Sequence, residues 1–410
     1  MAAQPENLWR DIRTLPRPAW ILFAGSFINR FGSFVTVFLV LYLVDSGFSV
    51  AEAGLAASAY GAGSLASAAV GGYLADRFGR RSTIAVSMFG AAAAAILLSQ
   101  AGALGSVIAL TAVFGLLSEL YRPASSALLA DVVPEGRRLT AFAGYRLAIN
   151  AGFAFGPAVA GYLAHRSFFY LFLGEAITSV VFGVVALAAL PEGTRSRRSE
   201  ERRGESVRSI AADRRFLLFL LATILAAFVY MQSEATLPLH VRDSGLGTTT
   251  HGWLISLNGL LIVTLEFPLI SITRRFAAPP VVATGVVLTG IGFALTGVAD
   301  TAFLLALTVV IWTFGEMVAA PVGSAYVADL APPHLRGRYQ GAFNLTFAIG
   351  FVLAPALGTR LYDRSPGALW LVCGLLGIVS GAMILGSRRL RARPELALPE
   401  AGPDVPGTPR

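Results

Sequence analysis

The sequence predicts an all-α integral membrane protein, with twelve transmembrane helices arranged in two six-helix, pseudo-symmetric bundles. Three observations predict this fold class: a hydrophobic composition, apolar segments long enough to cross a bilayer, and an internal repeat. Of the 410 residues, 55% are hydrophobic and only 14% are charged, and the mean hydropathy is +0.67. A soluble protein of this length needs a much larger charged surface, so most of the chain is expected within a membrane.

Apolar segments recur along the whole chain, and each is long enough to cross ~30 Å of hydrocarbon as a helix. Short polar connections separate these segments and hold most of the charge. The first segment is too long for the core of a signal peptide, so it is expected to remain as a helix. The expected spans are residues 19–44, 51–75, 82–101, 104–131, 139–163, 168–190, 216–239, 250–271, 280–299, 301–329, 338–361 and 367–386.

The distribution of positive charge predicts the orientation in the membrane. All 32 basic residues are arginines, and the formal net charge is +8. Arginines concentrate in every second connection, with eight between Arg195 and Arg215, whereas the alternate connections hold four. The positive-inside rule therefore predicts a multi-pass protein of the inner membrane with both termini in the cytoplasm. Topology and contact with lipid headgroups account for the basic balance, so no nucleic-acid partner is expected.

The internal repeat becomes visible when the chain is shifted by 198 residues. Residues 45–47 (Asp-Ser-Gly) then fall on residues 243–245, which have the same sequence. Pro123 falls on Pro321, Asp131 on Asp329, Pro134 on Pro332, Gly152 on Gly350 and Pro157 on Pro355. Shared membrane composition matches alanine and leucine freely, but it does not match aspartate, proline and glycine in one register.

Two similar halves in parallel repeat are the plan of a transporter whose halves rock around a central substrate cavity. The Arg-rich and Ser-rich segment between the halves is typical of a flexible tether. The predicted domains are a bundle at 1–190, a cytoplasmic linker at 191–215, a second bundle at 216–390 and a disordered cytoplasmic tail at 391–410.

Two motifs connect the chain to a known family. Residues 72–81 (GYLADRFGRR) follow the second span, and residues 152–161 (GFAFGPAVAG) lie within the fifth. The first motif resembles the loop signature of the major facilitator superfamily. The second resembles the fifth-helix signature of its twelve-helix drug:proton antiporters, with Ala160 in place of a glycine. The resemblance spans nearly the whole chain, because the helix count and the repeat also agree with it.

The resemblance implies roles for both motifs. Asp76, Arg80 and Asp131 are expected to form a charge relay that latches a cytoplasmic gate, although the arginines of this loop also follow the positive-inside rule. The second half lacks the loop signature, so any latch there is built differently. In the fifth span, close helix packing and a proline bend predict a hinge or a seal, with ordinary membrane packing as the alternative. The hinge residues are Gly152, Gly156, Pro157 and Gly161.

Ionisable residues at membrane depth are functional candidates because an unpaired charge there costs several kcal/mol. Glu316 is expected to carry protons, since burial favours the protonated form of a carboxylate and the residue resembles a tenth-helix glutamate of proton-coupled relatives. The alternative is a static ion pair with Arg30 or Arg146. Glu266 is the second proton candidate. Arg122 is expected to face the proton path or to pair with Glu119, three residues away.

Two other glutamates, Glu175 and Glu234, are expected nearer the outer face, where water can solvate them. The Asn29-Arg30 pair stands where some antiporters carry a carboxylate, so Arg30 is expected either to attract an anionic substrate or to tune an opposite carboxylate. The candidate cavity residues are Asn29, Arg30, Tyr145, Arg146, Asn150, Gln232, Asn258 and Asn344.

The expected function is export of small organic molecules, drugs or metabolites, in exchange for protons by alternating access. One alternative is a proton symporter for uptake of a peptide, sugar or other nutrient, and another is a membrane sensor that transports nothing. An enzyme is not expected, because the sequence offers no nucleophile–base pair and no metal-ligand cluster. The expected partners are a small-molecule substrate, protons and lipids, with no cofactor and no metal, and the chain is expected to be a monomer.

Overall fold

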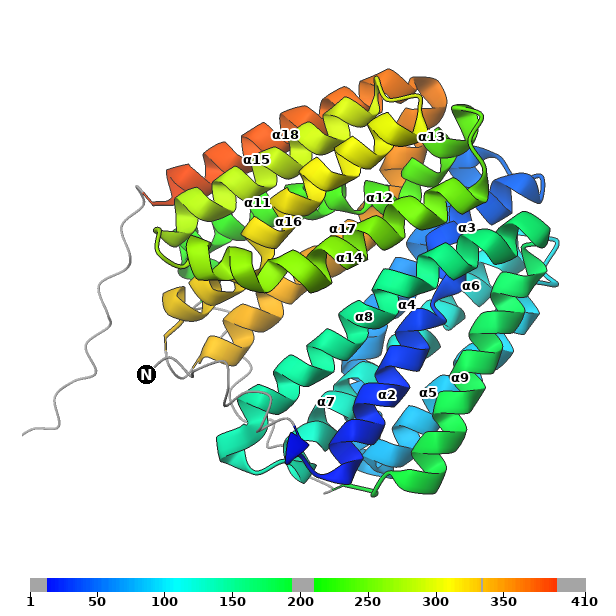
Figure 1. The fold of residues 1–410 in the computed structure, drawn as a ribbon, viewed down its shortest axis with the longest axis vertical. Helices are drawn as coiled ribbons and strands as arrows, with labels where there is room; N and C mark the ends of the chain where they lie inside the picture. The colour runs from blue at the N-terminus through cyan, green and yellow to red at the C-terminus, as the bar shows by residue number, and fades with distance from the viewer. Residues whose placement is uncertain (1–12, 194–209, 333–334, 389–410) are drawn as a thin grey trace, which may run out of the picture.

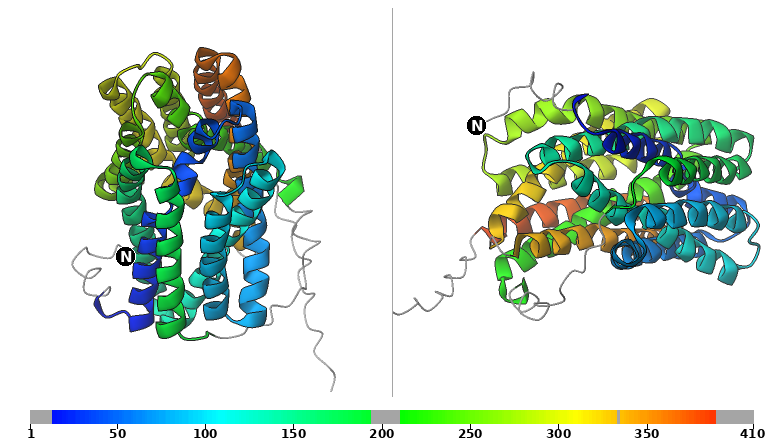
Figure 2. Two further views of the ribbon diagram at one scale, coloured as in Figure 1. Left: turned by 90° about the vertical axis from the view of Figure 1, so that its right-hand side faces the viewer. Right: turned by 90° about the horizontal axis from the view of Figure 1, so that it is seen from below.

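A computed structural model describes residues 13–193, 210–332 and 335–388 of the chain. Within these ranges every regular element is a helix, and no strand occurs. The helices form two bundles that lie side by side (Figure 1), an arrangement that two further views also show (Figure 2). Residues 194–209 of the expected linker and the whole expected tail lie outside the described residues.

The first bundle contains residues up to Ala189 and is built from long helices, two of which are interrupted. The interruptions lie at Gly32–Ser33 and at Leu120. The helices are α2 (Arg17–Phe31), α3 (Phe34–Asp45), α4 (Val50–Phe78), α5 (Arg80–Leu98), α6 (Leu104–Glu119), α7 (Tyr121–Val132), α8 (Arg138–Arg166) and α9 (Phe169–Ala189), with a 3-10 turn, η1 (Glu135–Arg137), before α8.

The second bundle repeats this plan 198 residues later. The helix α5 (Arg80–Leu98) corresponds to α15 (Ala278–Thr296) at both ends, and α8 corresponds in the same way to α17. The first helix of this bundle is also broken, at Met231 and again at Thr236. The helices are α11 (Arg214–Tyr230), α12 (Gln232–Ala235), α13 (Leu237–Asp243), α14 (Thr248–Thr273), α15 (Ala278–Thr296), α16 (Ala302–Leu330), α17 (Arg336–Arg364) and α18 (Pro366–Ser387).

Two short turns that require the same residues explain why the repeat can be detected in the sequence. Gly47 follows α3 with a φ of 96°, and Gly245 follows α13 with a φ of 75°. Glycine adopts this left-handed region without the penalty that a side chain imposes, so the same Asp-Ser-Gly turn ends both helices. The next helix, α4, begins with a capping box, in which Ser49 and Glu52 each accept the other's backbone N–H.

Eleven segments in the described part of the chain are long and apolar enough to span a membrane. The expected span at 51–75 forms α4, a 29-residue helix that is not among the eleven. The twelve-helix count therefore stays a prediction. The spans expected at 19–44, 104–131 and 216–239 are not single helices, because the breaks named above divide each of them.

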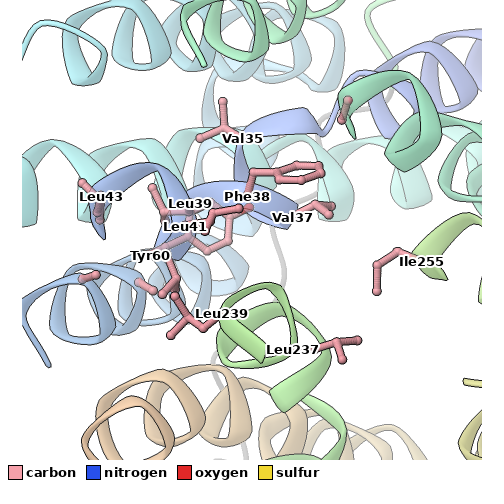
Figure 3. Close-up of a cluster of buried hydrophobic side chains, with 14 of the residues drawn as sticks. Val35, Val37, Phe38, Leu39, Leu41, Leu43, Tyr60, Leu237, Leu239 and Ile255 are labelled. Atoms are coloured by element: carbon pink, nitrogen blue, oxygen red, sulfur yellow. The ribbon is translucent and has the colours of Figure 1, made fainter. Parts of the chain in front are cut away.

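The buried core is shared by the two bundles at one end of the molecule and is separate in each bundle at the other end. One hydrophobic cluster contains residues of both bundles; among them Figure 3 shows Phe38, Leu39 and Tyr60 of the first bundle near Leu237 and Leu239 of the second. Two further clusters each belong to one bundle. We call the end with the shared cluster the far side; it carries the turns after α3 and α13. The opposite end, where α2 begins and α9 ends, is the terminal side.

On the far side, the closest backbone contacts between the bundles lie within the pairs α8–α14 and α4–α17, and α3 also contacts α12 and α13. A Cβ on Gly252 of α14 would lie 2.3 Å from the carbonyl oxygen of Pro157, and one on Gly61 of α4 would lie 2.6 Å from that of Phe351. Towards the terminal side, a Cβ on Gly337 or Gly341 of α17 would meet no described atom within 4 Å. The bundles are therefore sealed on the far side and separated on the terminal side.

Candidate functional site

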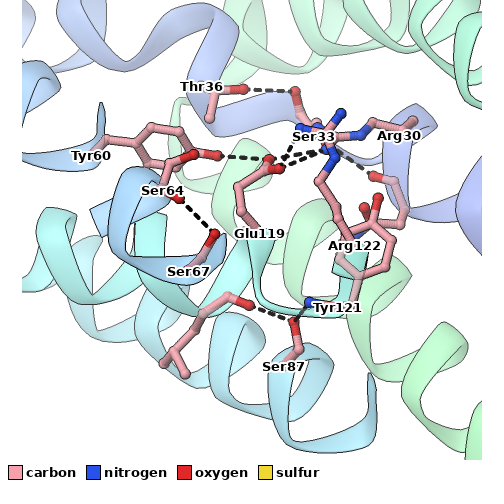
Figure 4. Close-up of polar contacts among 12 residues, drawn as sticks. Arg30, Ser33, Thr36, Tyr60, Ser64, Ser67, Ser87, Glu119, Tyr121 and Arg122 are labelled. Atoms are coloured by element: carbon pink, nitrogen blue, oxygen red, sulfur yellow. Dashed lines mark hydrogen bonds and ion pairs between the residues drawn. The ribbon is translucent and has the colours of Figure 1, made fainter. Parts of the chain in front are cut away.

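A buried ion-pair cluster occupies the centre of the first bundle, beside the α2–α3 break (Figure 4). The Nη2 atom of Arg30 donates to both carboxylate oxygens of Glu119, each at 3.0 Å. Arg122 Nη1 donates to Glu119 Oε2 at 2.9 Å, and the Tyr60 hydroxyl donates to Oε1 at 3.4 Å. Two guanidinium groups compensate one carboxylate, so Glu119 is held in its ionised form.

The two arginines of this cluster have different surroundings. The Arg30 side chain is mostly buried, whereas 54% of the Arg122 side chain is exposed, although both contact the same carboxylate. The expected pairing of Glu119 with Arg122 is present. Arg30 completes the cluster from a position 89 residues away in sequence. Of the two roles expected for Arg30, attracting an anionic substrate or contacting an opposite carboxylate, the structure shows the contact with a carboxylate.

A second buried carboxylate of the first bundle belongs to Glu175 of α9, whose side chain reaches the start of α3. It is only 6% exposed, and its Oε2 accepts the backbone N–H of Val35 at 2.8 Å. The first N–H groups of a helix have no partner within the helix, and a carboxylate is favoured near this positive end. The expectation that water solvates Glu175 is therefore wrong: the residue caps a helix that begins inside the bundle.

The second bundle has a carboxylate site of a different kind. Glu316 lies in α16, and its Oε2 accepts a hydrogen bond from Asn258 Nδ2 at 2.9 Å. The same Asn258 nitrogen lies 3.1 Å from the hydroxyl oxygen of Thr313. Among the described residues, no arginine or histidine forms an ion pair with Glu316. The static partnership with Arg30 or Arg146 is absent, because each of these arginines binds another glutamate.

The repeat relates the two sites. Tyr60 and Asn258 are 198 residues apart, and each donates a hydrogen bond to a carboxylate in its own bundle. Glu119 and Glu316 differ by 197, so the two acids lie one residue apart in the repeat register. The register thus relates two similar sites, one in each bundle, and among the described ion pairs only the first site contains arginines.

An ion pair connects the bundles. Arg146 of α8 donates from Nη2 to Glu266 Oε1 of α14. The arginine side chain is 57% exposed and the glutamate side chain 10% exposed, so solvent reaches one member of the pair. This pair lies closer to the terminal side than the Gly252–Pro157 contact of the same two helices, since Arg146 is near the start of α8 and Glu266 near the end of α14.

The loop motif forms a compact corner at the terminal side of the first bundle. Gly79, with a φ of 95°, separates α4 from α5, and Arg80 at the start of α5 forms an ion pair with Asp131 at the end of α7. Arg80 also donates from Nη1 to the carbonyl oxygen of Ala127 at 2.7 Å. Asp76 attracts Arg80 electrostatically, but no hydrogen bond between them is present. All these residues belong to one bundle.

The motif in α8 lies at two helix contacts. Gly152 and Gly156 face α2, where a Cβ on either would lie within 2.6 Å of a backbone oxygen of Phe27 or Phe31. Beyond Pro157, the backbone N–H of Ala158 donates to Ser256 Oγ of the other bundle at 2.9 Å. Thr248 Oγ1 donates to the carbonyl oxygen of Gly161 at 3.1 Å. The small residues therefore allow close packing, and the end of the motif contributes to the far-side seal.

Several candidate cavity residues point into a bundle instead. Asn29 Nδ2 contacts the Met88 sulfur at 3.5 Å, and Gln232 Nε2 donates to the carbonyl oxygens of Phe228 and Ala354. Tyr145 is buried in the terminal-side core of the first bundle. These polar side chains stabilise their own bundle because buried amides need hydrogen-bond partners. Asn150 is half-buried and Asn344 is exposed.

A cavity between the bundles was expected, but Thr36 and Glu234 were not among the residues expected to line it. Its polar lining residues are Thr36 and Tyr60 from the first bundle and Glu234 from the second. Glu234 lies in α12 and lines this cavity, where it is partly exposed, so the expectation that water can solvate it stays a prediction. The repeat register contained a usable signal, because it pairs Tyr60 with Asn258 and Thr36 with Glu234.

The family model of the Major Facilitator Superfamily matches residues 22–263 and 235–407, which together cover most of the chain. The chain belongs to the major facilitator superfamily. A Na(+), Li(+), K(+)/H(+) antiporter of Planococcus maritimus is 27% identical, with 88% of this chain and 92% of that protein covered. The multidrug resistance protein MdtH of Aeromonas salmonicida is 26% identical, with 88% and 93% covered.

Solved structures of the superfamily share this fold. The crystal structure of a peptide transporter POT in complex with sulfate matches with a TM-score of 0.77 and 19% identity. The match covers 92% of this chain and 97% of that one. Two halves that seal on one side and separate on the other are the arrangement by which such transporters expose a central site to each side in turn. The chain is thus a membrane transporter of this superfamily.

Proposed function

We propose that this superfamily member exports a small molecule in exchange for protons, and that Glu316 carries the proton. The observation that carries the proposal is the difference between the two central carboxylates. Two arginines bind Glu119, whereas Glu316 is bound by the amide of Asn258. A proton is the charge that Glu316 lacks, since an uncompensated carboxylate at membrane depth is costly.

Alternating access supplies the remaining steps. With the far side sealed, the central residues are reached from the terminal side, which the arginine-rich connections assign to the cytoplasm. Substrate enters there while Glu316 loses its proton, and the halves then rock to open the far side. Protonation from the far side favours release and return. The protein acts as a monomer in the inner membrane, surrounded by lipid.

The other charged candidates receive supporting roles in this proposal. Glu266 forms an ion pair with Arg146, whereas Glu316 has no such pair among the described residues, so of these two candidates the proposal assigns the proton to Glu316. The Arg80–Asp131 pair, with Asp76 beside it, braces the corner of the first bundle that forms the gate on the terminal side. The hinge motif in α8 accompanies the rocking, because its end contacts α14.

Export is favoured over uptake by two related proteins, one named as a cation/proton antiporter and one as a multidrug resistance protein. Symport of a nutrient remains the rival function, and structures of a peptide transporter and of a D-xylose-proton symporter share the fold. The direction of solute accumulation under an imposed pH gradient separates the two functions. A sensor would move no solute under any gradient.

The test is transport in proteoliposomes that contain a fluorescent pH indicator. A ligand thermal-shift screen first identifies a transported solute. Wild-type protein is then expected to couple solute movement to proton movement, and Glu316→Gln to abolish this coupling while solute–solute exchange continues. Glu266→Gln serves as the matched membrane-depth control and is expected to keep the coupling. Unchanged proton movement in Glu316→Gln would refute the assignment.

A further inference from the structure

A small, partly open cavity lies between the bundles, where the shared hydrophobic cluster begins. Its inner volume is about 30 Å³, which holds about two water molecules or one small ion. The first bundle contributes the hydroxyl-bearing side chains Thr36 and Tyr60, and α12 of the second contributes Glu234. The other lining residues are apolar, so Glu234 is the single ionisable group that faces this space apart from the Tyr60 phenol.

The carboxylate of Glu234 has no recorded partner within the described parts of the chain, neither a hydrogen bond nor an ion pair. Arg30 is the cation that attracts it electrostatically, and Glu119 repels it. Arg30, however, directs its hydrogen bonds to both oxygens of Glu119. The Tyr60 hydroxyl lines the cavity and donates its proton to Glu119, so the lone pairs of its oxygen remain available as acceptors.

Counting charges around this cavity gives a deficit of one positive charge. Two arginines, Arg30 and Arg122, lie in the central cluster with the carboxylates of Glu119 and Glu175. Adding Glu234 makes three carboxylates against two guanidinium groups. Because a net charge at membrane depth costs several kcal/mol, one further positive charge stabilises the cluster whenever all three acids are ionised.

We infer that Glu234, with the hydroxyl oxygens of Thr36 and Tyr60, binds one small monovalent cation. The ligand is an alkali-metal ion or the terminal ammonium group of an organic solute; both are single positive charges that oxygen donors coordinate. The cavity is too small for a quaternary ammonium head. This inference rests on the proposed function and names its solute class: a compact cation at Glu234 is exported against a proton at Glu316.

The position of the cavity couples binding to the conformation. Its lining comes from α3 and α4 on one side and from α12 and α17 on the other, so rocking of the bundles takes the donors apart. A cation that all of these donors hold stabilises the far-side-sealed state, and opening of the far side weakens its binding. The same geometry therefore binds the ion on the terminal side and releases it on the far side.

The test measures binding without transport, by the thermal unfolding midpoint of purified protein in chloride salts of sodium, lithium, potassium, ethylammonium and choline. Wild type is expected to show a saturable rise with at least one of the four compact cations and none with choline. Glu234→Gln is expected to weaken the apparent affinity by at least about tenfold, and Thr36→Val by a smaller factor. Glu135→Gln, a surface change, serves as the control.

Each outcome decides the inference. A shift with an alkali salt or with ethylammonium identifies the source of the charge, whereas equal shifts with choline, or a wild-type response in Glu234→Gln, overturn the site. If Glu234→Gln does not fold, Glu234→Asp is expected to fold and to change the order of preference among the cations. Glu316→Gln is expected to bind the cation normally while losing proton coupling, so the site and the proposed function can fail separately.

Discussion

The far-side seal makes a prediction that depends on a single methyl group. In Gly252→Ala, the new Cβ of α14 would lie 2.3 Å from the carbonyl oxygen of Pro157 and 3.0 Å from the Cα of Gly161. Both neighbours are backbone atoms, so α8 and α14 must move apart. Overpacking of this kind costs about 1–3 kcal/mol. Because the contact exists only when the far side is sealed, the cost falls on that state and changes the ratio of states by about 5- to 150-fold.

The change is measured as a distance between the bundles on the far side. Spin labels are placed at Gln100→Cys and Asp300→Cys, which are exposed positions of opposite bundles. The single native cysteine, Cys373, is buried in α18 and does not interfere. Gly252→Ala is expected to add or enlarge a population at longer distance.

The matched control for this variant lies five residues away. Gly247 precedes the same helix with a φ of −80°, and no atom lies within 4 Å of its Cβ position. Gly247→Ala is therefore expected to keep the wild-type distance distribution. If Gly252→Ala gave the wild-type distribution as well, while folding normally, the packing argument for the seal would be refuted.

Two further predictions concern the ion pairs. Glu119→Gln leaves Arg30 and Arg122 without their counter-ion. Because breaking a buried ion pair costs about 3–5 kcal/mol, the thermal unfolding midpoint is expected to fall. The double variant Glu119→Gln/Arg122→Gln is expected to recover part of this loss. Equal midpoints for wild type and Glu119→Gln would contradict the cluster. Glu266→Gln removes an ion pair whose arginine side chain is 57% exposed. Such a pair contributes about 1 kcal/mol or less, so the transport rate is expected to change less than about tenfold. The charge exchange Arg146→Glu/Glu266→Arg is expected to restore the rate. A complete loss in Glu266→Gln would instead make Glu266 essential.

The parts of the fold that sequence predicted are those that depend on local chemistry. The Asp-Ser-Gly turns before Phe48 and Leu246 need glycine at a positive φ, so the repeat kept those letters in one register. Hydropathy located the spans but not the breaks within them. The break at Gly32–Ser33 lies inside a segment, Arg17–Asp45, that is apolar enough overall to be one span, and the break is stabilised by Glu175 from a distant helix.

The candidate site was predictable only where partners lie a few residues apart in sequence or share the repeat. Glu119 and Arg122 are three residues apart, so their pairing was expected. The contact of Arg30 with Glu119 and that of Arg146 with Glu266 join positions 89 and 120 residues apart, and sequence spacing carries no information about them. The burial of Glu175 was also misjudged, because the position of an acid along a helix does not reveal which face of the helix it occupies.

The contrast between the two bundles also has an evolutionary reading in physical terms. From one repeated plan, a carboxylate with two arginines and a carboxylate with an amide have arisen at nearly equivalent positions. The first carboxylate is bound by two arginines, one of them at the end of α2. The second lacks an arginine partner within the described residues, and in the proposed function it is the group that changes its charge, which coupling to a proton gradient requires.

Infrared pH titration of the purified protein tests this contrast most directly, since the stretching band of a protonated carboxyl group reports its charge without any ligand. The account predicts that the difference between wild type and Glu316→Gln contains a carboxyl band that disappears as the pH is raised. The difference between wild type and Glu119→Gln is expected to contain no such band. A titrating band assigned to Glu119, or none assigned to Glu316, would contradict the account.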